Sequence, residues 1–387
     1  MVKHDFDVVI VGAGIVGAAL AAALRGSGLE LALVEQRPPE EPSSQWDARI
    51  YAFSPGSVAL LDSVGVWSQL DAGRIAPVRA MDVRGDRGGH VLLDAYEAGV
   101  PQLAWIAESG RVQHGVWQAL RNQPDLTLFA GVQGRDLRWS SAGARLELDN
   151  GEQISARLVV AADGRGSWVR GQAGIGAHRG DYHQSGVVAN FACTRAHENI
   201  ARQWFREDGI LAWLPLPGHT LSMVWSTDAV RTAELLALSP EGLAERVAEA
   251  GGHVLGDLRV LTPAAAFPLS ILRVDSLVAP GLALIGDAAH GVHPLSGQGV
   301  NLGLRDVARL ARVLRERGEA GCGDLPVLRR YERARRGDIL AMQTVTNTLY
   351  HLFGARHPLL ARLRNTGMDV VQQLAPLKSR LMQQALA

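Results

Sequence analysis

The sequence has only two cysteines among its 387 residues, Cys193 and Cys322, and they lie far apart. Two such residues supply neither the spacing of a zinc site nor a framework of disulfides. We therefore expect two reduced, buried thiols in a cytoplasmic protein, and no metal site.

The chain also lacks an excess of charge of either sign, because 39 Lys and Arg balance 39 Asp and Glu. A whole-chain electrostatic footprint for nucleic acid is therefore absent, and we expect no nucleic-acid partner. The charge is uneven, however. From Arg305 to the C-terminus there are 15 Lys or Arg and 7 Asp or Glu, a net charge of +8.

This basic C-terminal region has two interpretations. One is a solvated helical face. The other is peripheral contact with the anionic inner face of a membrane. Apolar side chains within the region would support the second interpretation; they are Leu349, Leu352, Phe353, Leu359 and Leu360.

An uncharged stretch of apolar residues and glycine occupies residues 8–24, but it does not read as a signal peptide or a membrane helix. Acidic residues offset the basic ones before it. Residues 6–11 are β-branched, residues 12–17 are rich in glycine and residues 15–24 are rich in alanine, which predicts a strand, a turn and a helix. We expect no targeting segment and no transmembrane span.

The remaining pattern predicts an α/β protein with two domains. Residues 6–34 form a βαβ unit, and short strands are expected within 75–105 and 126–160. A buried strand is expected at 282–285. The expected helices are residues 56–70, 111–121, one segment near 232–250, 299–317, 326–353 and a C-terminal tail.

Residues 178–275 differ from the rest of the chain in their residue pattern, because tryptophan and proline occur among strand-like runs. This predicts a second, mainly antiparallel β-sheet domain. The first domain is then discontinuous and comprises residues 1–74, 106–177 and 276–350. The second comprises residues 75–105 and 178–275, and residues 351–387 form a C-terminal helical tail.

The first motif is Gly12-Ala-Gly14-Ile-Val-Gly17, between the predicted strand and helix. Gly12 permits the tight turn, Gly14 lets a pyrophosphate approach the backbone, and Gly17 lets the helix pack on the strand. Glu35 ends the next strand, where a carboxylate binds ribose hydroxyls. The motif predicts a bound dinucleotide and leaves NAD and FAD both open.

The second motif, Asp163-Gly-Arg-Gly-Ser-Trp-Val-Arg170, follows a buried strand. Taken alone it indicates an ordinary turn at the end of a strand, because Asp-Gly is common in turns.

The third motif begins at Gly286-Asp287 and continues through His293-Pro294 and a glycine-rich loop to Asp306. A carboxylate at Asp287 can bind the hydroxyls of a ribityl chain. The loop amides and the start of the following helix form a nest of positive potential. Such a nest suits the electron-rich edge of a reduced flavin.

The three motifs, in this order and spacing, resemble the flavoprotein monooxygenases related to para-hydroxybenzoate hydroxylase. The resemblance covers nearly the whole chain, and the segment 293–306 is most similar to the ubiquinone-biosynthesis hydroxylases, the UbiH, UbiF, UbiI and VisC proteins. The segments 47–49, 52–54 and 108–117 share it. The sequence departs at Ser296, where this subgroup usually has Ala or Gly.

The resemblance implies a Rossmann-like, glutathione-reductase-like FAD-binding domain and a separate substrate domain. It implies that Glu35 binds the adenosine ribose, Asp287 the ribityl hydroxyls, and the amides of Val300 and Asn301 the flavin ring. Arg49 would lie near the diphosphate or the ring entrance, although an arginine there is equally typical of a surface. The expected cofactor-binding residues are Gly12, Gly14, Gly17, Glu35, Arg49, Gln113, Asp163, Asp287, Gly299, Val300 and Asn301.

The resemblance also implies the chemistry. NAD(P)H, bound transiently, would reduce FAD, and O2 would then hydroxylate an electron-rich ring. The sequence has no second Gly-x-Gly-x-x-Gly motif for the nicotinamide and no motif for a Ser-His-Asp triad. His293 and Pro294 are the candidates for a catalytic role, and His290 could also relay a proton. The alternative for these histidines is a hydrogen bond that shapes the loop.

The function that the resemblance implies is hydroxylation of a polyprenylated phenol or benzoquinol in ubiquinone biosynthesis. The expected partners are that substrate, O2, a ubiquinone-biosynthesis complex and the membrane surface. The alternatives are another aromatic-compound hydroxylase, a prenyl-chain reductase or halogenase of the same fold, or a non-catalytic flavoprotein subunit of a complex.

Overall fold

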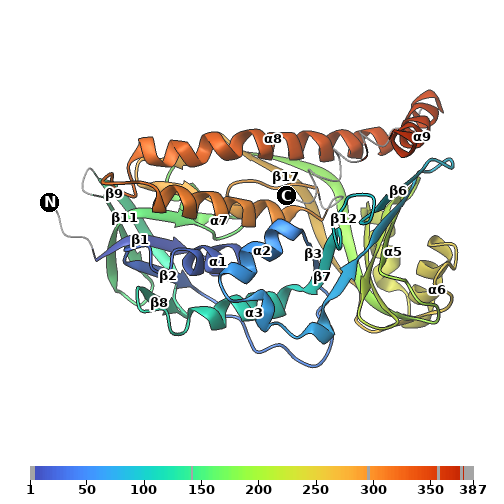
Figure 1. Ribbon diagram of the computed structural model, residues 1–387, viewed down its shortest axis with the longest axis horizontal. Helices are drawn as coiled ribbons and strands as arrows, with labels where there is room; N and C mark the ends of the chain where they lie inside the picture. The colour runs from blue at the N-terminus through green and yellow to red at the C-terminus, as the bar shows by residue number, and fades with distance from the viewer. Residues whose placement is uncertain (1–4, 141–142, 294–296, 355–357, 375–377, 379–387) are drawn as a thin grey trace.

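The computed structural model describes residues 5–140, 143–293, 297–354, 358–374 and 378. The molecule is elongated, with one large sheet towards each end and the long helix α8 (Leu325–Gly354) along its length (Figure 1). This mixed α/β architecture confirms the predicted fold class.

The first large sheet has the strand order β18-β19-β11-β1-β2-β8, with β10 and β9 attached beside β11. Its centre is parallel, and the apolar runs of β1 and β11 are buried there, as is typical of a parallel sheet that is covered on both faces. Its strands are β1 (Phe6–Val11), β2 (Leu31–Glu35), β8 (Leu126–Ala130), β9 (Gly134–Ser140), β10 (Gly143–Leu148), β11 (Gln153–Ala161), β18 (Val278–Ala279) and β19 (Leu282–Leu284).

Helices surround this sheet. Helix α1 (Ile15–Ala23) packs against both α3 (Ser109–Leu120) and α7 (Gly299–Arg315). Helix α8 lies over α7 (Figure 1). Helix α1 begins in the first motif and α7 begins in the third, so their packing brings Gly12 and Gly286, 274 residues apart in the sequence (286 − 12), to one edge of the sheet. The helices α2 (Pro55–Ser63) and α4 (Trp168–Gln172) complete this part.

The second large sheet has the order β16-β12-β15-β14-β13-β5-β6, with β17 beside β12. All its pairs are antiparallel except β13 with β5. Its strands are β5 (Ala80–Arg84), β6 (His90–Asp94), β12 (Ala177–Cys193), β13 (Ile200–Arg206), β14 (Gly209–Leu216), β15 (Thr220–Asp228), β16 (Leu258–Val260) and β17 (Ala265–Val274).

Two features differ from the expectations. The strands β4 (Ala76–Val78) and β7 (Ala104–Glu108) join β3 (Ile50–Phe53) in a separate three-stranded sheet. The segment near 232–250 is two helices, α5 (Ala229–Ala237) and α6 (Pro240–Ala250). The break occurs because a proline begins α6 and Ser239 caps it.

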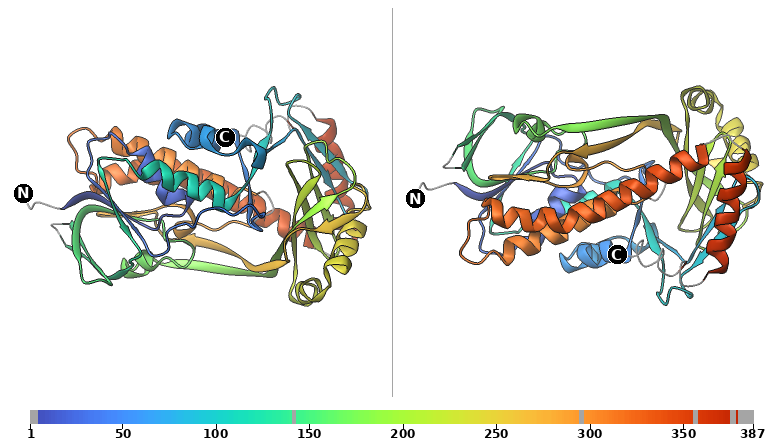
Figure 2. Two further views of the ribbon diagram at one scale, coloured as in Figure 1. Left: turned by 90° about the horizontal axis from the view of Figure 1, so that it is seen from below. Right: turned by 90° about the horizontal axis from the view of Figure 1, so that it is seen from above.

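The C-terminal helices form the outer layer of the molecule. Helix α8 spans from the first sheet to the second, and α9 (Pro358–Gln373) packs on β6 (Figure 2). None of the helices in the described part of the chain combines the length and apolar character that crossing a bilayer requires.

Candidate cofactor and substrate site

The glycines of the first motif divide into two that pack and one that faces open space. Gly12 has a φ of 99°, and a Cβ there would lie 2.5 Å from the carbonyl oxygen of Ala162. A Cβ on Gly17 would lie 1.9 Å from the carbonyl oxygen of Gly12. A Cβ on Gly14 would meet no protein atom within 4 Å. Gly14 therefore leaves room for a phosphate beside the N-terminus of α1.

Two side chains hold the backbone of this loop at Ala13. A carboxylate oxygen of Glu35 accepts a hydrogen bond of 2.6 Å from the Ala13 amide. The side-chain amide of Gln113, from α3, donates to the Ala13 carbonyl at 3.5 Å. Glu35 is half-buried at the end of β2, where a ribose beside the loop would meet it.

The second motif is tied into the fold by its side chains. Asp163 accepts a hydrogen bond of 3.0 Å from the amide of Val169, and Ser167 caps α4. The buried guanidinium of Arg170 reaches the carbonyl oxygen of Ala288 in the third motif. Asp163 does not line the main cavity, whereas the neighbouring Arg165 does.

The third motif places an exposed carboxylate beside this arginine. Asp287 lines the cavity, and its Oδ2 lies 3.8 Å from Nη2 of Arg165. The preceding Gly286 donates its amide to Asp306 at 2.9 Å. The buried Asp306 of α7 therefore fixes the backbone next to Asp287.

Asp306 is the centre of a buried ionic cluster. Its Oδ2 lies 2.5 Å from Nε2 of His290, and its Oδ1 accepts a hydrogen bond of 2.7 Å from Arg335. Burial alone would raise the pKa of Asp306, but His290 and Arg335 outweigh it and hold the pKa below the ordinary value. His290 is thus engaged away from the cavity.

The N-terminus of α7 faces the cavity. Gly299, Val300 and Asn301 line it, and these residues supply the amides at the start of a helix, which have no partner within the helix. The side chain of Asn301 is used elsewhere. Its Oδ1 accepts from the Ser54 amide, and its Nδ2 donates to the Ala52 carbonyl, both at 2.9 Å.

His293 lies apart from the cavity lining. It is fully buried, and its ring centroid is 4.7 Å from that of Tyr182 and 5.4 Å from that of Tyr350. Burial lowers the pKa of His293 to about 4, so its ring is neutral at pH 7. This position favours a role in shaping the loop. Pro294 lies outside the described residues.

Arg49 and Tyr51 line the cavity from the β3 side. Arg49 is exposed, and its amide donates to Asp47. Burial is the main cause that raises the pKa of Tyr51, and Arg49 acts in the opposite direction. Sequence reasoning missed Tyr51 because a single tyrosine in a short strand carries no motif.

The cofactor-motif residues that line the cavity and one face of the second sheet together bound a volume of about 890 Å³. Side chains of the sheet form its other wall, and β14 supplies alternate residues, as expected for one face of a strand. The members from this sheet are Met81, Leu93, Val188, Ala201, Gln203, Ile210, Ala212, Leu214, Val224, Ser226, Ala265, Phe267, Pro268, Leu269 and Ser270. Charged side chains of the described lining come only from the other wall; they are Asp47, Arg49, Arg165 and Asp287.

The residues present fit FAD. The open space at Gly14 and the first amides of α1 suit the diphosphate. Asp287 suits the ribityl hydroxyls, and the amides of Val300 and Asn301 suit the polar edge of the ring. The structure brings the expected Gly14, Arg49, Gln113, Asp287, Gly299, Val300 and Asn301 to the cavity. The expected Gly12, Gly17, Glu35 and Asp163 are not among the residues that line it.

Comparison with known proteins gives relatives along the whole chain. The model of a family described as FAD binding domain matches residues 5–348. The chain is 38% identical to 3-demethoxyubiquinol 3-hydroxylase of Escherichia coli K12, with 100% of both chains covered. It is 31% identical to the human mitochondrial ubiquinone biosynthesis monooxygenase COQ6, with 97% of this chain and 92% of that one covered.

Solved structures give the same fold. The p-nitrophenol 4-monooxygenase PnpA of Pseudomonas putida matches with a TM-score of 0.79 and 19% identity, over 98% of each chain. PqsL of Pseudomonas aeruginosa, described as a probable FAD-dependent monooxygenase, matches with a TM-score of 0.78 and 22% identity, over 94% of this chain and 99% of that one. At these identities the likeness concerns the fold alone.

Proposed function

Because the chain belongs to the family described as FAD binding domain, we propose that its apolar cavity holds a polyprenylated phenol or benzoquinol for ring hydroxylation on the path to ubiquinone. The chain is an FAD-dependent monooxygenase, and its named relatives are hydroxylases and monooxygenases of ubiquinone biosynthesis. This confirms the resemblance found in the sequence and the FAD cofactor that it implied.

The cofactor and the protein have different roles in the proposed reaction. When bound, FAD supplies the redox chemistry by which electrons from NAD(P)H and O2 become a ring hydroxylation. The protein orients the cofactor through Asp287 and the α1 loop, and the positive end of α7 stabilises negative charge beside Val300 and Asn301. The second sheet excludes water from the reacting ring.

The observation that carries the substrate proposal is the wall from the second sheet, whose described side chains are uncharged. A carboxylate held against this wall would find no charged partner on it, which is costly in an apolar site. Gln203 and Ser226 offer the wall polar groups for the ring oxygens of a neutral phenol. The wall therefore favours a neutral, apolar ring.

The prenyl tail needs a way out of the cavity. Three exposed residues near the start of β17, Ala265, Phe267 and Pro268, also line it, and they form an apolar mouth. Phe267 pairs with Gly186 of β12, and a Cβ on Gly186 would lie 2.9 Å from the Phe267 ring. We assign the tail to this mouth, with the Phe267 ring beside it.

A polyprenylated substrate partitions into a bilayer, since each buried CH2 contributes about 0.8 kcal/mol. We therefore extend the proposal to peripheral association with the membrane and with other enzymes of the pathway. The prediction that His293 and Pro294 are catalytic stays a prediction, and the aromatic surroundings of His293 support a structural role.

The proposal is tested by deleting the gene, extracting lipids and identifying quinone intermediates by mass spectrometry. We expect an under-hydroxylated prenylated phenol to accumulate and ubiquinone to fall. Restoring the wild-type gene should reverse both changes, while a variant unable to bind FAD should not. Normal ubiquinone in a strain without a redundant hydroxylase would refute the substrate. Full rescue by the FAD-free variant would indicate a non-catalytic subunit instead.

A further inference from the structure

Helix α8 changes character along its length. Its first part, up to Asp338, is dense in charged residues, whereas residues 339–354 contain no Asp, Glu, Lys or Arg. The helix lies on the outside of the molecule and extends from the first sheet towards the second (Figures 1 and 2). An exposed helix normally turns a charged face to water, so this uncharged part needs an explanation.

The uncharged part has an inner face that packs and an outer face that does not. On the inner face, Gln343 is buried and donates hydrogen bonds to the carbonyls of Leu272 and Gly291. Leu340 borders the groove between the helix and β17 and is 55% exposed, and Val345, on the outer face, is 51% exposed. We define the α8 face by the exposed residues at helical spacing, which are Leu340, Ala341, Thr344, Val345 and Thr348.

The apolar residues that the sequence suggested for membrane contact lie elsewhere. The ring of Phe353 stacks on Phe205 of β13, with centroids 3.6 Å apart, so this side chain packs on the second sheet. Leu349 and Leu352 are only partly exposed. The side chains of Leu359 and Leu360 lie outside the described residues. The side chain of Phe353 is therefore unavailable for membrane contact, whereas the side chains of the α8 face are exposed.

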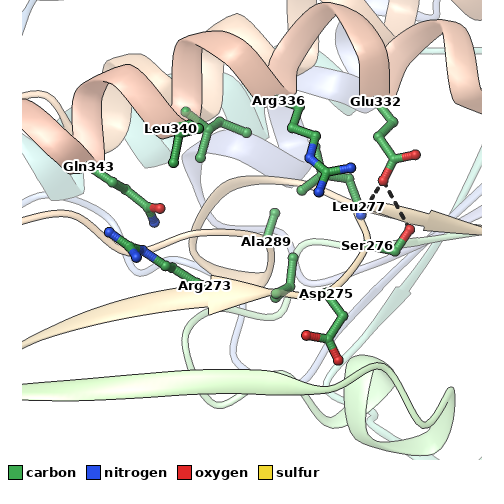
Figure 3. A pocket seen from close by; sticks show the side chains of 11 residues that line it. Arg273, Asp275, Ser276, Leu277, Ala289, Glu332, Arg336, Leu340 and Gln343 are labelled. Carbon is green, nitrogen blue, oxygen red and sulfur yellow. Dashed lines mark hydrogen bonds between the residues drawn. The ribbon is translucent and has the colours of Figure 1, made fainter.

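Three arginines flank the α8 face. Arg336 and Arg333 lie about one and two turns before Leu340 on α8. Arg273 faces the helix from β17 (Figure 3). All three are exposed. Within the described part of the chain, none of the three guanidinium groups has a hydrogen bond or an ion pair.

The carboxylates nearby are already engaged. Glu332 accepts hydrogen bonds from the Ser276 hydroxyl and the Leu277 amide, as Figure 3 shows. Asp275 lies 2.9 Å from His178. Asp338 pairs with Arg335 of the buried ionic cluster. Because Asp338 is paired with an arginine, the three arginines outnumber the two other carboxylates, Glu332 and Asp275, and the rim of the α8 face has a net charge of +1 (three positive, two negative).

We propose that the α8 face and its rim of Arg273, Arg333 and Arg336 dock on an anionic lipid bilayer. An apolar helical stripe beside basic side chains is the arrangement that lies in the interface of a membrane. Each arginine near an anionic surface contributes about 1 kcal/mol, which is about a fivefold change in partition. The surface argument stands without the substrate, and delivery of a membrane-borne substrate rests on the proposed function.

The test is flotation of the FAD-loaded protein with vesicles of phosphatidylcholine alone or with about one-third phosphatidylglycerol. We expect binding to the anionic vesicles only, and release at high salt because salt screens the charge. Changing all three arginines to Gln should weaken the partition on the order of a hundredfold. Leu340→Glu with Val345→Glu should abolish it.

Matched controls distinguish binding through this surface from non-specific electrostatic or hydrophobic binding to vesicles. Arg138→Gln, an exposed arginine on β9, and Leu236→Glu, an exposed leucine on α5, should bind vesicles as the wild type does. Flavin absorbance reports that each variant is folded. Wild-type partition by the double glutamate variant would overturn the proposal. The proposal would also be overturned if the wild-type protein did not bind anionic vesicles and instead formed a dimer that dissociates in the Leu340→Glu variant.

Discussion

The Nη1 of Arg170 donates a hydrogen bond of 2.7 Å to the carbonyl oxygen of Ala288. This bond joins the second motif to the third, 118 residues further along the chain. Arg170 is only 4% exposed, and burial is the main cause that lowers the pKa of its guanidinium. Its pKa stays far above neutrality, as for any arginine, so a buried charge fixes the loop that carries Asp287.

Asp287→Ala should weaken FAD binding on the order of tenfold to a hundredfold. The carboxylate points into the cavity, and loss of one charge-assisted hydrogen bond costs about 1.5–3 kcal/mol. Fluorescence titration of the apoprotein with FAD measures the affinity. Asp136→Ala, which removes a surface carboxylate on β9, is the control and should leave it unchanged. An unchanged affinity for the Asp287 variant would remove this residue from the site.

Gly14→Ala should weaken FAD binding, whereas Gly17→Ala should destabilise the fold. The new Cβ at position 14 meets no protein atom, so the apoprotein should melt normally but bind FAD at least about tenfold more weakly. The new Cβ at position 17 would collide with the Gly12 carbonyl, so that variant should lose stability before FAD is added. Thermal melts with and without FAD separate the two. Normal FAD affinity in Gly14→Ala would contradict the diphosphate position.

Ala212→Phe should raise the KM for a prenylated phenol on the order of tenfold or more, because the larger ring fills the apolar wall. FAD affinity should stay the same, since position 212 lies on the sheet wall. Steady-state kinetics and FAD titration measure the two effects. Ala233→Phe on the exposed face of α5 serves as the matched control. If both parameters stay at wild-type values, the ring does not bind against β14.

His293→Phe should make the protein less sensitive to acid. The folded-state pKa of His293 is about 4, below the ordinary value of about 6.5, so its neutral form contributes stability above pH 6.5 that is lost as the pH falls towards 4. The wild type should therefore lose about 2–3 kcal/mol relative to the variant between pH 7 and pH 4.5. Urea unfolding at both pH values measures this. Parallel losses in the two proteins would show that His293 titrates normally.

Local features of the cofactor site could be predicted from the sequence because short-range sterics and helix termini determine them. The turn at Gly12, the carboxylate at Glu35 and the helix that begins at Gly299 each follow from a motif. The same holds for the class of fold, because uninterrupted apolar runs predict buried parallel strands.

Features that depend on strand register and on contacts between distant residues could not be predicted from the sequence. The face of β14 that lines the cavity depends on its register with β13 and β15, which alternation alone does not orient. The position of His293 depends on Tyr182 and Tyr350, more than 50 residues away in either direction. The side of α8 that packs likewise depends on a long-range contact, the stacking of Phe353 on Phe205.

The proposed reaction is the insertion of one oxygen atom into the ring of a neutral prenylated phenol. Purified FAD-loaded protein, NAD(P)H and such a phenol should be incubated under isotopically labelled O2, and the products analysed by mass spectrometry. We expect a ring hydroxyl that carries one labelled oxygen atom, and NAD(P)H consumption that depends on the phenol. NAD(P)H oxidation without any labelled phenol product, or label only in hydrogen peroxide, would contradict it.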